Sequence, residues 1–250
     1  MVEVAIDIYC DAFVEPNRHE LDSEPVVEIA SGIRGVAHTR LLVADDSGYG
    51  RLVTEVACPR PGVVFVLDRA SRCDRFLHDQ PGWTAHATEL AMVLRDIRAV
   101  TGTALPDGLD LRCVDRVGSG APDAVPLKDA VDAAIASDPG ITDSADRVAA
   151  YLSGLPPSVR LFAAVDETGI VRATSACHVF GEYTQVFFVS TEPDWRRRGI
   201  GSAMTAGALR GAASLGARSA LLHSTADGAS LYKRLGFEAL GMLTRYSYAD

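Results

Sequence analysis

The chain has 250 residues, of which 48% are hydrophobic and 23% are charged, and its formal net charge is -9 at pH 7. This length and apolar content allow one large core or two modest ones. The sequence contains no run of about 18 apolar residues, so no membrane span is expected. Residues 1–125 carry 12 basic and 20 acidic side chains, whereas residues 126–250 carry 12 and 13. This acidity argues against general nucleic-acid binding, while a cationic substrate and a solvated acidic surface both fit it.

Cysteine usage and the N-terminal composition favour a cytoplasmic protein without a metal. The five cysteines are widely spaced, form no C-x-x-C pair and have no histidine at ligand spacing; they are Cys10, Cys58, Cys73, Cys113 and Cys177. We therefore expect neither a disulfide framework nor a zinc site. The N-terminal segment is acidic and lacks the basic start and small-residue cleavage site of a signal peptide.

The first half of the chain contains strand patterns but no chemical motif. An apolar helix is expected before the polar interruption at 16–25, and buried strands are expected at 39–45 and 62–68. Residues 87–100 mix strand and helix signals. This half alone indicates no function.

The second half alternates strands and helices more clearly. Around a flexible loop at 117–126 we expect strands at 109–115, 158–166, 170–180, 184–191, 219–224 and 240–248, and helices at 127–139, 144–157, 199–215 and 227–237. Ser144 is the expected N-cap of the second helix, and Gly216 the left-handed residue after the third. This order predicts an α/β protein of the α+β type, with one mixed sheet flanked by helices.

The helix at 199–215 has a pattern that predicts burial. Its apolar and small residues fall on one stripe, which consists of Ile200, Ala203, Met204, Gly207, Ala208, Gly211, Ala212 and Leu215. Small residues allow a helix to lie close to a sheet, so packing explains these positions without a function.

The start of that helix, in the stretch WRRRGIGSAM (195–204), has the composition of an anion site. The first amides of a helix lack partners and carry a partial positive charge, and glycines let an anion approach them. Solvated arginines beside a shape-forming turn are the alternative. However, cations at a positive helix end are unfavourable by about a few tenths of a kcal/mol each unless an anion binds. We therefore expect an anion here, namely the diphosphate of a coenzyme.

Two common phosphate motifs do not fit this stretch. A P-loop requires a lysine after the glycines, and none is present. A dinucleotide fingerprint requires Gly or Ala where Met204 stands, and no acidic residue ends the next strand.

The longer pattern resembles the GNAT superfamily of acyl-CoA-dependent N-acetyltransferases. The family signature [QR]-x-x-G-x-[GA] corresponds to Arg196, Gly199 and Gly201, after the approach VFFVSTEPDW. Downstream, SALLHSTADGASLYKRLGF is similar to the fifth strand of the family and the following helix, which carries a tyrosine and ends in L-G-F. The resemblance covers about residues 106–250, so it implies a GNAT domain there. It leaves 1–105 as a smaller, divergent α/β region that could be a degenerate second copy.

The resemblance implies how acetyl-CoA would be bound. Backbone amides and side chains at the helix start would hold its diphosphate; the residues are Arg196, Arg197, Arg198, Gly199, Ile200, Gly201 and Ser202. The backbone of Val189 and Thr191 would pair with the pantetheine arm as an added strand does. A backbone N–H near Phe188 or Val189 would stabilise the oxyanion.

The resemblance also assigns a catalytic acid. Tyr232 matches the tyrosine of the family that protonates the leaving thiolate, although helix packing would also explain it. Ser224 could bind either Tyr232 or the cosubstrate. The general base stays open, because Glu182 could face solvent and His178 and His223 could equally be structural. Tyr183, Phe187 and Phe188 could line a substrate cleft or form core.

The expected function is transfer of an acetyl group from acetyl-CoA to a primary amine of a small molecule or peptide by direct attack. The alternative is a non-catalytic acyl-CoA sensor that keeps the diphosphate site and has lost the chemistry. Nucleic-acid and membrane partners are not expected. The identity of the acceptor and the formation of a homodimer are left open.

Overall fold

The computed structural model describes residues 26–30, 33–36, 40–43, 45–57, 62–101, 104–138 and 143–248. The helix expected before residue 16 lies outside these residues. No helix within the described part is long and apolar enough to cross a membrane. The same part of the chain contains no group of three His, Cys, Asp or Glu side chains that could hold a metal ion.

The chain forms two compact units that are interleaved in sequence. The first unit comprises residues 1–95, 223–233 and 237–250, and the second comprises 96–222 and 234–236. The domain boundary expected at residue 105 stays a prediction, and the last strand of the chain belongs to the first unit.

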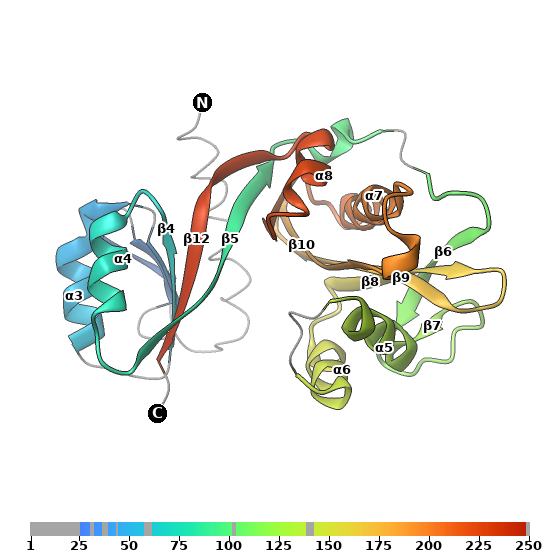
Figure 1. Ribbon diagram of the computed structural model, residues 1–250, viewed down its shortest axis with the longest axis horizontal. Coiled ribbons are helices and arrows are strands. Elements are labelled where there is room, and N and C mark those ends of the chain that lie inside the picture. Colours follow the sequence, from blue (N-terminus) through green and yellow to red (C-terminus); the bar gives the residue numbers. More distant parts are fainter. Residues whose placement is uncertain are drawn as a thin grey trace. The chain divides into compact units, whose positions relative to one another are not determined.

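The first unit contains a sheet with helices on one face (Figure 1). Its strands follow the order β1 (Val26–Ala30), β2 (Ile33–Val36), β3 (Arg40–Val43), β4 (Gly62–Leu67), β12 (Glu238–Tyr248) and β5 (Trp83–Leu94). Strand β12 is antiparallel to both β4 and β5. Helices α3 (Tyr49–Ala57) and α4 (Ser71–His78) pack on this sheet, where Leu52 and Leu77 meet Val64, Val66 and Tyr246 in one buried cluster.

The strand predictions for this half lie close to the observed strands. Strands β3 and β4 fall inside the expected ranges 39–45 and 62–68. The mixed signal at 87–100 corresponds to the end of β5 followed by a 3-10 turn, η2 (Ile97–Ala99). Helices α3 and α4 were not predicted.

The second unit has the mixed, mostly antiparallel sheet that the sequence predicts. Its strands follow the order β11 (Ser219–Ser224), β10 (Tyr183–Thr191), β9 (Val171–Phe180), β8 (Val159–Asp166), β6 (Leu109–Asp115) and β7 (Val125–Pro126). Only the β10–β11 and β6–β7 pairs are parallel among these described strands. Helix α7 (Ile200–Ala213) covers one face, and α5 (Leu127–Ser137) and α6 (Ala145–Gly154) cover the other (Figure 1).

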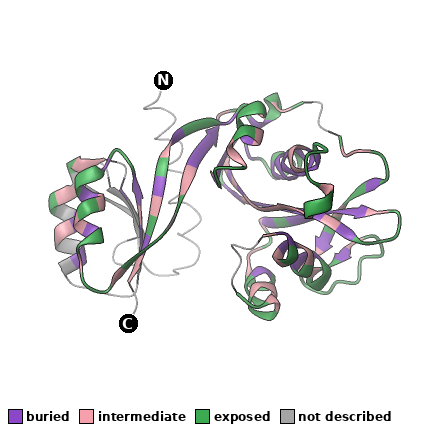
Figure 2. Ribbon diagram, in the orientation of Figure 1, coloured by how far each residue is buried: buried purple, intermediate pink, exposed green. Residues whose placement is uncertain are grey.

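Helix α7 lies close to the sheet because its stripe is built from small residues. A Cβ added at Gly211 would come within 2.4 Å of Cζ of Phe162, and one at Gly207 within 2.9 Å of Cδ2 of Leu111. Figure 2 accordingly shows most of α7 as buried.

The structure contains the left-handed Gly216 that was predicted after α7 and the Ser144 N-cap that was predicted for α6. The Gly216 N–H donates to the Ala213 carbonyl and the Ala217 N–H donates to the Ala212 carbonyl, and Gly216 has φ +100°, which is the Schellman arrangement. The prediction that Leu215 is part of the buried stripe is wrong, since the helix ends at Ala213 and the Leu215 side chain is 37% exposed. The Ser144 side chain accepts from the Arg147 N–H and caps α6, as expected.

Candidate functional site

Strands β10 and β11 pair over a short stretch and then separate. Their register contains only the pairs Tyr183 with Ser219, Thr184 with Ala220, and Gln185 with Leu221. Strand β10 continues to Thr191 and remains paired with β9. From Val186 onward the other edge of β10 therefore has no strand partner within the described residues, and such an edge can accept an added extended chain.

A bulge interrupts β10 along this edge. Phe187 pairs with Ala176 and Ser190 pairs with Thr174, so β10 contains one more residue than β9 over this interval. Phe188 has φ +55°. The left-handed region costs a non-glycine residue about 1–2 kcal/mol, so the surrounding structure must stabilise this conformation.

The bulge turns one peptide group in a defined direction. The Thr174 hydroxyl on β9 donates to the Phe188 carbonyl over 2.9 Å. The chain contains no cis peptide bond among the described residues, and the C=O and N–H of a trans peptide point in opposite directions. The Val189 N–H therefore points away from β9, toward the edge of β10 that has no strand partner.

The Thr191 backbone faces the same edge. The Glu192 N–H donates to the Arg172 carbonyl on β9 over 2.9 Å. Because successive backbone groups of a strand alternate in direction, the amide of Thr191 points away from β9. Val189 and Thr191 thus share the orientation that pairing with an extended arm requires.

A run of unpaired amides follows directly after β10. After the 3-10 turn η3 (Pro193–Trp195), Arg197 has φ +64° and Gly199, the N-cap of α7, has φ +80°. No side chain caps this helix, and in the described part of the chain the amides from Arg197 to Ser202 donate to no protein acceptor. Ile200 is buried to 1% exposure, so it offers only its backbone.

The three arginines before α7 differ in their surroundings. Arg196 Nε donates to the Thr191 carbonyl over 3.0 Å, and its Nη2 donates to the Ser137 carbonyl at the end of α5. Arg198 Nη2 donates to the Asp194 carbonyl, and its Cζ lies 4.9 Å from the Trp195 ring centroid. Arg197 is exposed and has no side-chain partner among the described residues. Arg196 is thus anchored to two backbone carbonyls.

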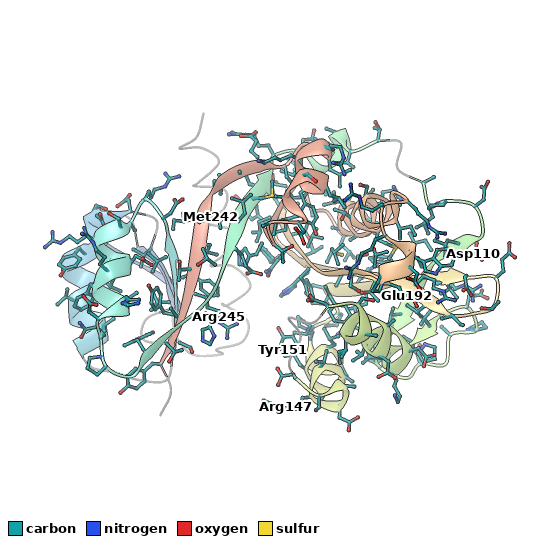
Figure 3. The ribbon with its side chains drawn as sticks, in the orientation of Figure 1. Asp110, Arg147, Tyr151, Glu192, Met242 and Arg245 are labelled. Carbon is teal, nitrogen blue, oxygen red and sulfur yellow. The ribbon has the colours of Figure 1, made fainter. Side chains whose placement is uncertain are left out.

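An ion-pair network that the sequence did not reveal supports this turn. Arg172 Nε lies 2.7 Å from Asp166 Oδ2, its Nη1 lies 2.6 Å from Glu192 Oε2, and its Cζ lies 5.2 Å from the Trp195 ring centroid. The Thr168 hydroxyl, with help from Arg172, holds the pKa of Asp166 well below its usual range. Figure 3 labels Glu192, which precedes η3.

Comparison with known proteins agrees with this geometry. Residues 157–239 match the family model described as an acetyltransferase (GNAT) domain. The matched segment covers 83 of the 250 residues of the chain. It contains the bulge, the separating strands and the start of α7. The comparison with curated proteins gives no match.

Solved GNAT structures share the fold. A GCN5-related N-acetyltransferase from Kribbella flavida is 18% identical, with a TM-score of 0.65, over 99% of this chain and 96% of that one. One from Sphaerobacter thermophilus is 16% identical, with a TM-score of 0.57, over 84% and 73%. A tandem GNAT protein from the clavulanic acid biosynthesis pathway is 12% identical, with a TM-score of 0.51, over 86% and 77%. These identities support likeness of the fold alone.

Tyr232, the acid implied by the GNAT resemblance, belongs to the first unit on α8 (Ala229–Arg234). It is buried, which raises its pKa to about 12. Its ring meets Phe237 edge to face, with 5.8 Å between centroids. Ser224 donates to the Thr225 carbonyl over 2.7 Å rather than to Tyr232.

The candidates for the base occupy different environments. Glu182 is exposed and lies 3.5 Å from Arg218, which fits the expectation that it faces solvent. The His178 ring packs edge to face on Phe180, with 5.4 Å between centroids. Nδ1 of His223 lies 3.5 Å from Oε2 of Glu89.

Two of the three aromatic residues of β10 contact the core, and a role of these residues in a substrate cleft stays a prediction. Phe187 and Phe188 pack against the buried cluster that contains Leu161 and Ala176. The Tyr183 ring lies 6.4 Å from that of Phe180.

Proposed function

We propose that this protein is an acetyl-CoA-dependent N-acetyltransferase that acts on a primary amine of a small molecule or peptide by direct attack. The observation that carries the proposal is the orientation of the Val189 N–H. It lies on the unpaired edge of β10, a few residues before the free amides of α7.

The residues at the start of α7 suit a diphosphate. The amides from Arg197 to Ser202 donate to no acceptor in the described residues, and a Cβ at Gly199 would meet nothing within 4 Å. Arg197 and Arg198 supply forked donors, whereas Arg196 fixes the turn to β10 and α5. Bound acetyl-CoA would supply the activated acetyl group.

The backbone of β10 would orient the acetyl end. Val189 and Thr191 pair with the amides of the pantetheine arm as a partner strand would. The Val189 N–H donates to the thioester oxygen, on which negative charge develops as the amine attacks. A single preorganised donor of this kind typically contributes about 10²–10³ in rate.

Tyr232 would stabilise the departing thiolate. Its pKa of about 12 keeps the hydroxyl protonated at neutral pH. A thiol has a pKa of about 8.5, so complete proton transfer from Tyr232 is uphill. We therefore assign Tyr232 a hydrogen bond that stabilises the thiolate, and the thiolate takes its proton from the amine that has attacked or from water.

Calorimetry with coenzyme A and a thiol-release assay with acetyl-CoA and an amine panel test this proposal together. We expect CoA binding and acceptor-dependent thiol release. Gly201→Val should weaken CoA binding while the protein stays folded. Tight CoA binding without thiol release would instead support the non-catalytic acyl-CoA sensor. If the folded protein does not bind CoA at millimolar concentration, both functions are contradicted.

A further inference from the structure

The bulge of β10 contains two hydroxyl groups that form one chain of hydrogen bonds. Oγ1 of Thr174 donates to the Phe188 carbonyl over 2.9 Å and also lies 2.9 Å from Oγ of Ser190. A hydroxyl has a single proton, and that of Thr174 is used on the carbonyl, which cannot donate. The proton between the two hydroxyls therefore comes from Ser190.

The opposite direction of this chain is unfavourable. If Thr174 donated to Ser190, the Phe188 carbonyl would lose this donor beside a residue that is only 1% exposed, and a buried acceptor without its partner is costly. Ser190 thus donates to Thr174, and its Oγ retains only lone pairs for a further partner. In the part of the chain that the structure describes, the Ser190 hydroxyl makes no other hydrogen bond.

Ser190 projects from the sheet face that α5 and α6 cover. It lies opposite Thr174 in the register, and Thr174 lies opposite Ala163 on β8; directly opposed residues share a face. Ala163 belongs to the buried cluster under α5 and α6, whereas α7 covers the other face (Figure 1). Ser190 is half-buried, so part of its surface remains accessible to a small molecule.

The Val189 N–H and the Ser190 hydroxyl are adjacent but point in different directions. The N–H points to the unpaired edge of β10, in the plane of the sheet, while the Ser190 side chain stands roughly perpendicular to that plane. An extended arm paired with this edge keeps its carbonyl groups near the plane, and a nucleophile approaches a carbonyl carbon from above or below. Since α7 covers one face, the amine approaches on the face of Ser190. All of these residues belong to the second unit.

We propose that Oγ of Ser190 accepts a hydrogen bond from the attacking amine and thereby orients its lone pair toward the thioester. The inference rests on the proposed acetyl transfer. The lone pair of R–NH₂ forms the C–N bond, and the C–S bond breaks. One N–H remains on Ser190 and stays in the product amide, while the other proton passes to the thiolate or to water. Ser190 exchanges no proton, because its own is held by Thr174.

This hydrogen bond distinguishes primary from secondary amines. A primary amine has two N–H groups, so one binds Ser190 while the other is lost. A secondary amine has a single N–H and must give it up, so it loses the hydrogen bond to Ser190 before the amide forms. Ser190 contacts the reacting amine and determines specificity, whereas Thr174 is a positioning residue.

Steady-state kinetics with two matched acceptors provide the test. The full chain is assayed with acetyl-CoA, the best primary amine from a panel of amines, and the N-methyl derivative of that amine. Positive charge develops on the attacking nitrogen, and hydrogen bonds from charged groups are the stronger ones. Ser190→Ala should therefore lower kcat/KM for the primary amine by about 10-fold or more, and for the N-methyl derivative by much less. CoA affinity should not change, because Thr174 still holds the Phe188 carbonyl.

A second pair of variants separates the hydroxyl from the shape of the side chain. Threonine and valine have nearly the same shape, so Ser190→Thr and Ser190→Val disturb the packing of β10 to a similar extent. Only Ser190→Thr retains the acceptor, so its kcat/KM for the primary amine should exceed that of Ser190→Val by about 10-fold. This comparison also decides the matter if the N-methyl derivative is not turned over.

Ser175→Ala is the matched control. The Ser175 hydroxyl is buried and donates to the Met204 carbonyl of α7 over 3.0 Å, so it lies on the face opposite Ser190. The control should lose stability without a loss of kcat/KM.

Three results would overturn this inference while CoA binding and acetyl transfer stand. They are equal rates in the threonine and valine variants, equal losses for both acceptors in Ser190→Ala, and a loss in Ser175→Ala as large as that in Ser190→Ala. A wild-type protein that does not bind CoA, or that binds CoA without transfer to any amine, would instead overturn the proposed function and with it the role of Ser190.

Discussion

The hydroxyl of Thr174 binds the carbonyl oxygen of Phe188, and this 2.9 Å contact joins the buried centre of β9 to the bulge of β10. Thr174 is 1% exposed, and its Oγ1 also lies 2.9 Å from the Ser190 hydroxyl on the other side of the bulge. The buried Thr174 hydroxyl thereby contacts two residues of the bulge, the left-handed Phe188 and Ser190. The direction of the Val189 N–H depends on this contact.

Thr174→Val should therefore lower kcat more than it weakens CoA binding. Valine keeps the shape of threonine but leaves the Phe188 carbonyl without its donor, so we expect about a 10-fold or greater loss of kcat as the Val189 N–H loses its orientation. Thr184→Val is the control, because Thr184 Oγ1 donates to the His178 carbonyl and lies before the bulge. Both variants should lose about 1 kcal/mol of stability, and equal kcat values in the two would contradict the assigned direction.

Two glycines at opposite ends of α7 allow a matched test of the diphosphate site. Gly199 and Gly216 have φ +80° and +100°, and a Cβ at either position would meet nothing within 4 Å. Alanine at each should cost about 1–2 kcal/mol of stability through backbone strain. Only Gly199→Ala should weaken CoA binding, by about tenfold, which corresponds to about 1.4 kcal/mol. A similar loss of affinity in Gly216→Ala would show that general destabilisation is responsible.

Arg172→Gln should weaken CoA binding indirectly, through the shape of the turn before α7. The substitution removes the guanidinium that holds Asp166 and Glu192 together beside Trp195, so the turn before α7 loses a support. Calorimetry should show a several-fold increase in Kd. The control is Arg112→Gln, which removes an exposed pair with Asp110 at 3.4 Å (Figure 3). An unchanged Kd in Arg172→Gln would mean that the turn holds its shape without this network.

The buried Tyr232 should make stability sensitive to alkaline pH. Its pKa is raised from 10.0 to about 12 in the folded protein, so its contribution is complete below pH 10 and is lost as the pH rises toward 12. At pH 11 the unfolded chain gains about 1.4 kcal/mol from ionising this group while the folded chain gains almost nothing.

Urea unfolding at pH 8 and pH 11 measures this effect. The stability of Tyr232→Phe relative to wild type should improve by about 1.4 kcal/mol between the two values. Parallel losses in both proteins would mean that Tyr232 ionises in the folded state as readily as in the unfolded chain. Tyr246 also has a raised pKa, through burial and Asp74, but it is present in both proteins.

The fold of the second half could be predicted because its local signals agree with its tertiary structure. Strand β11 occupies the expected range 219–224, and Gly216 ends α7 through its left-handed conformation. The first half was less predictable. Helices α3 and α4 have only 9 and 8 residues, which is shorter than the window of about 11–18 residues over which helical periodicity is read.

The site was predictable where it depends on local backbone and not where it depends on distant contacts. Glycines and arginines before a helix indicate an anion from sequence alone. In contrast, nothing in the residues around Phe188 predicts its φ of +55°, because Thr174 on another strand stabilises it. The same holds for Arg196 and Ser137, and for His223 and Glu89, which are far apart in sequence.

The position of β12 between β4 and β5 has a consequence for biosynthesis. Both neighbours leave the ribosome long before Glu238–Tyr248 is translated, so each exposes an unpaired edge that can associate with other nascent chains. A premature stop codon shortly before residue 238 would leave these edges permanently open. We therefore expect such a truncated product to depend on chaperones and to aggregate, because β12 is made last.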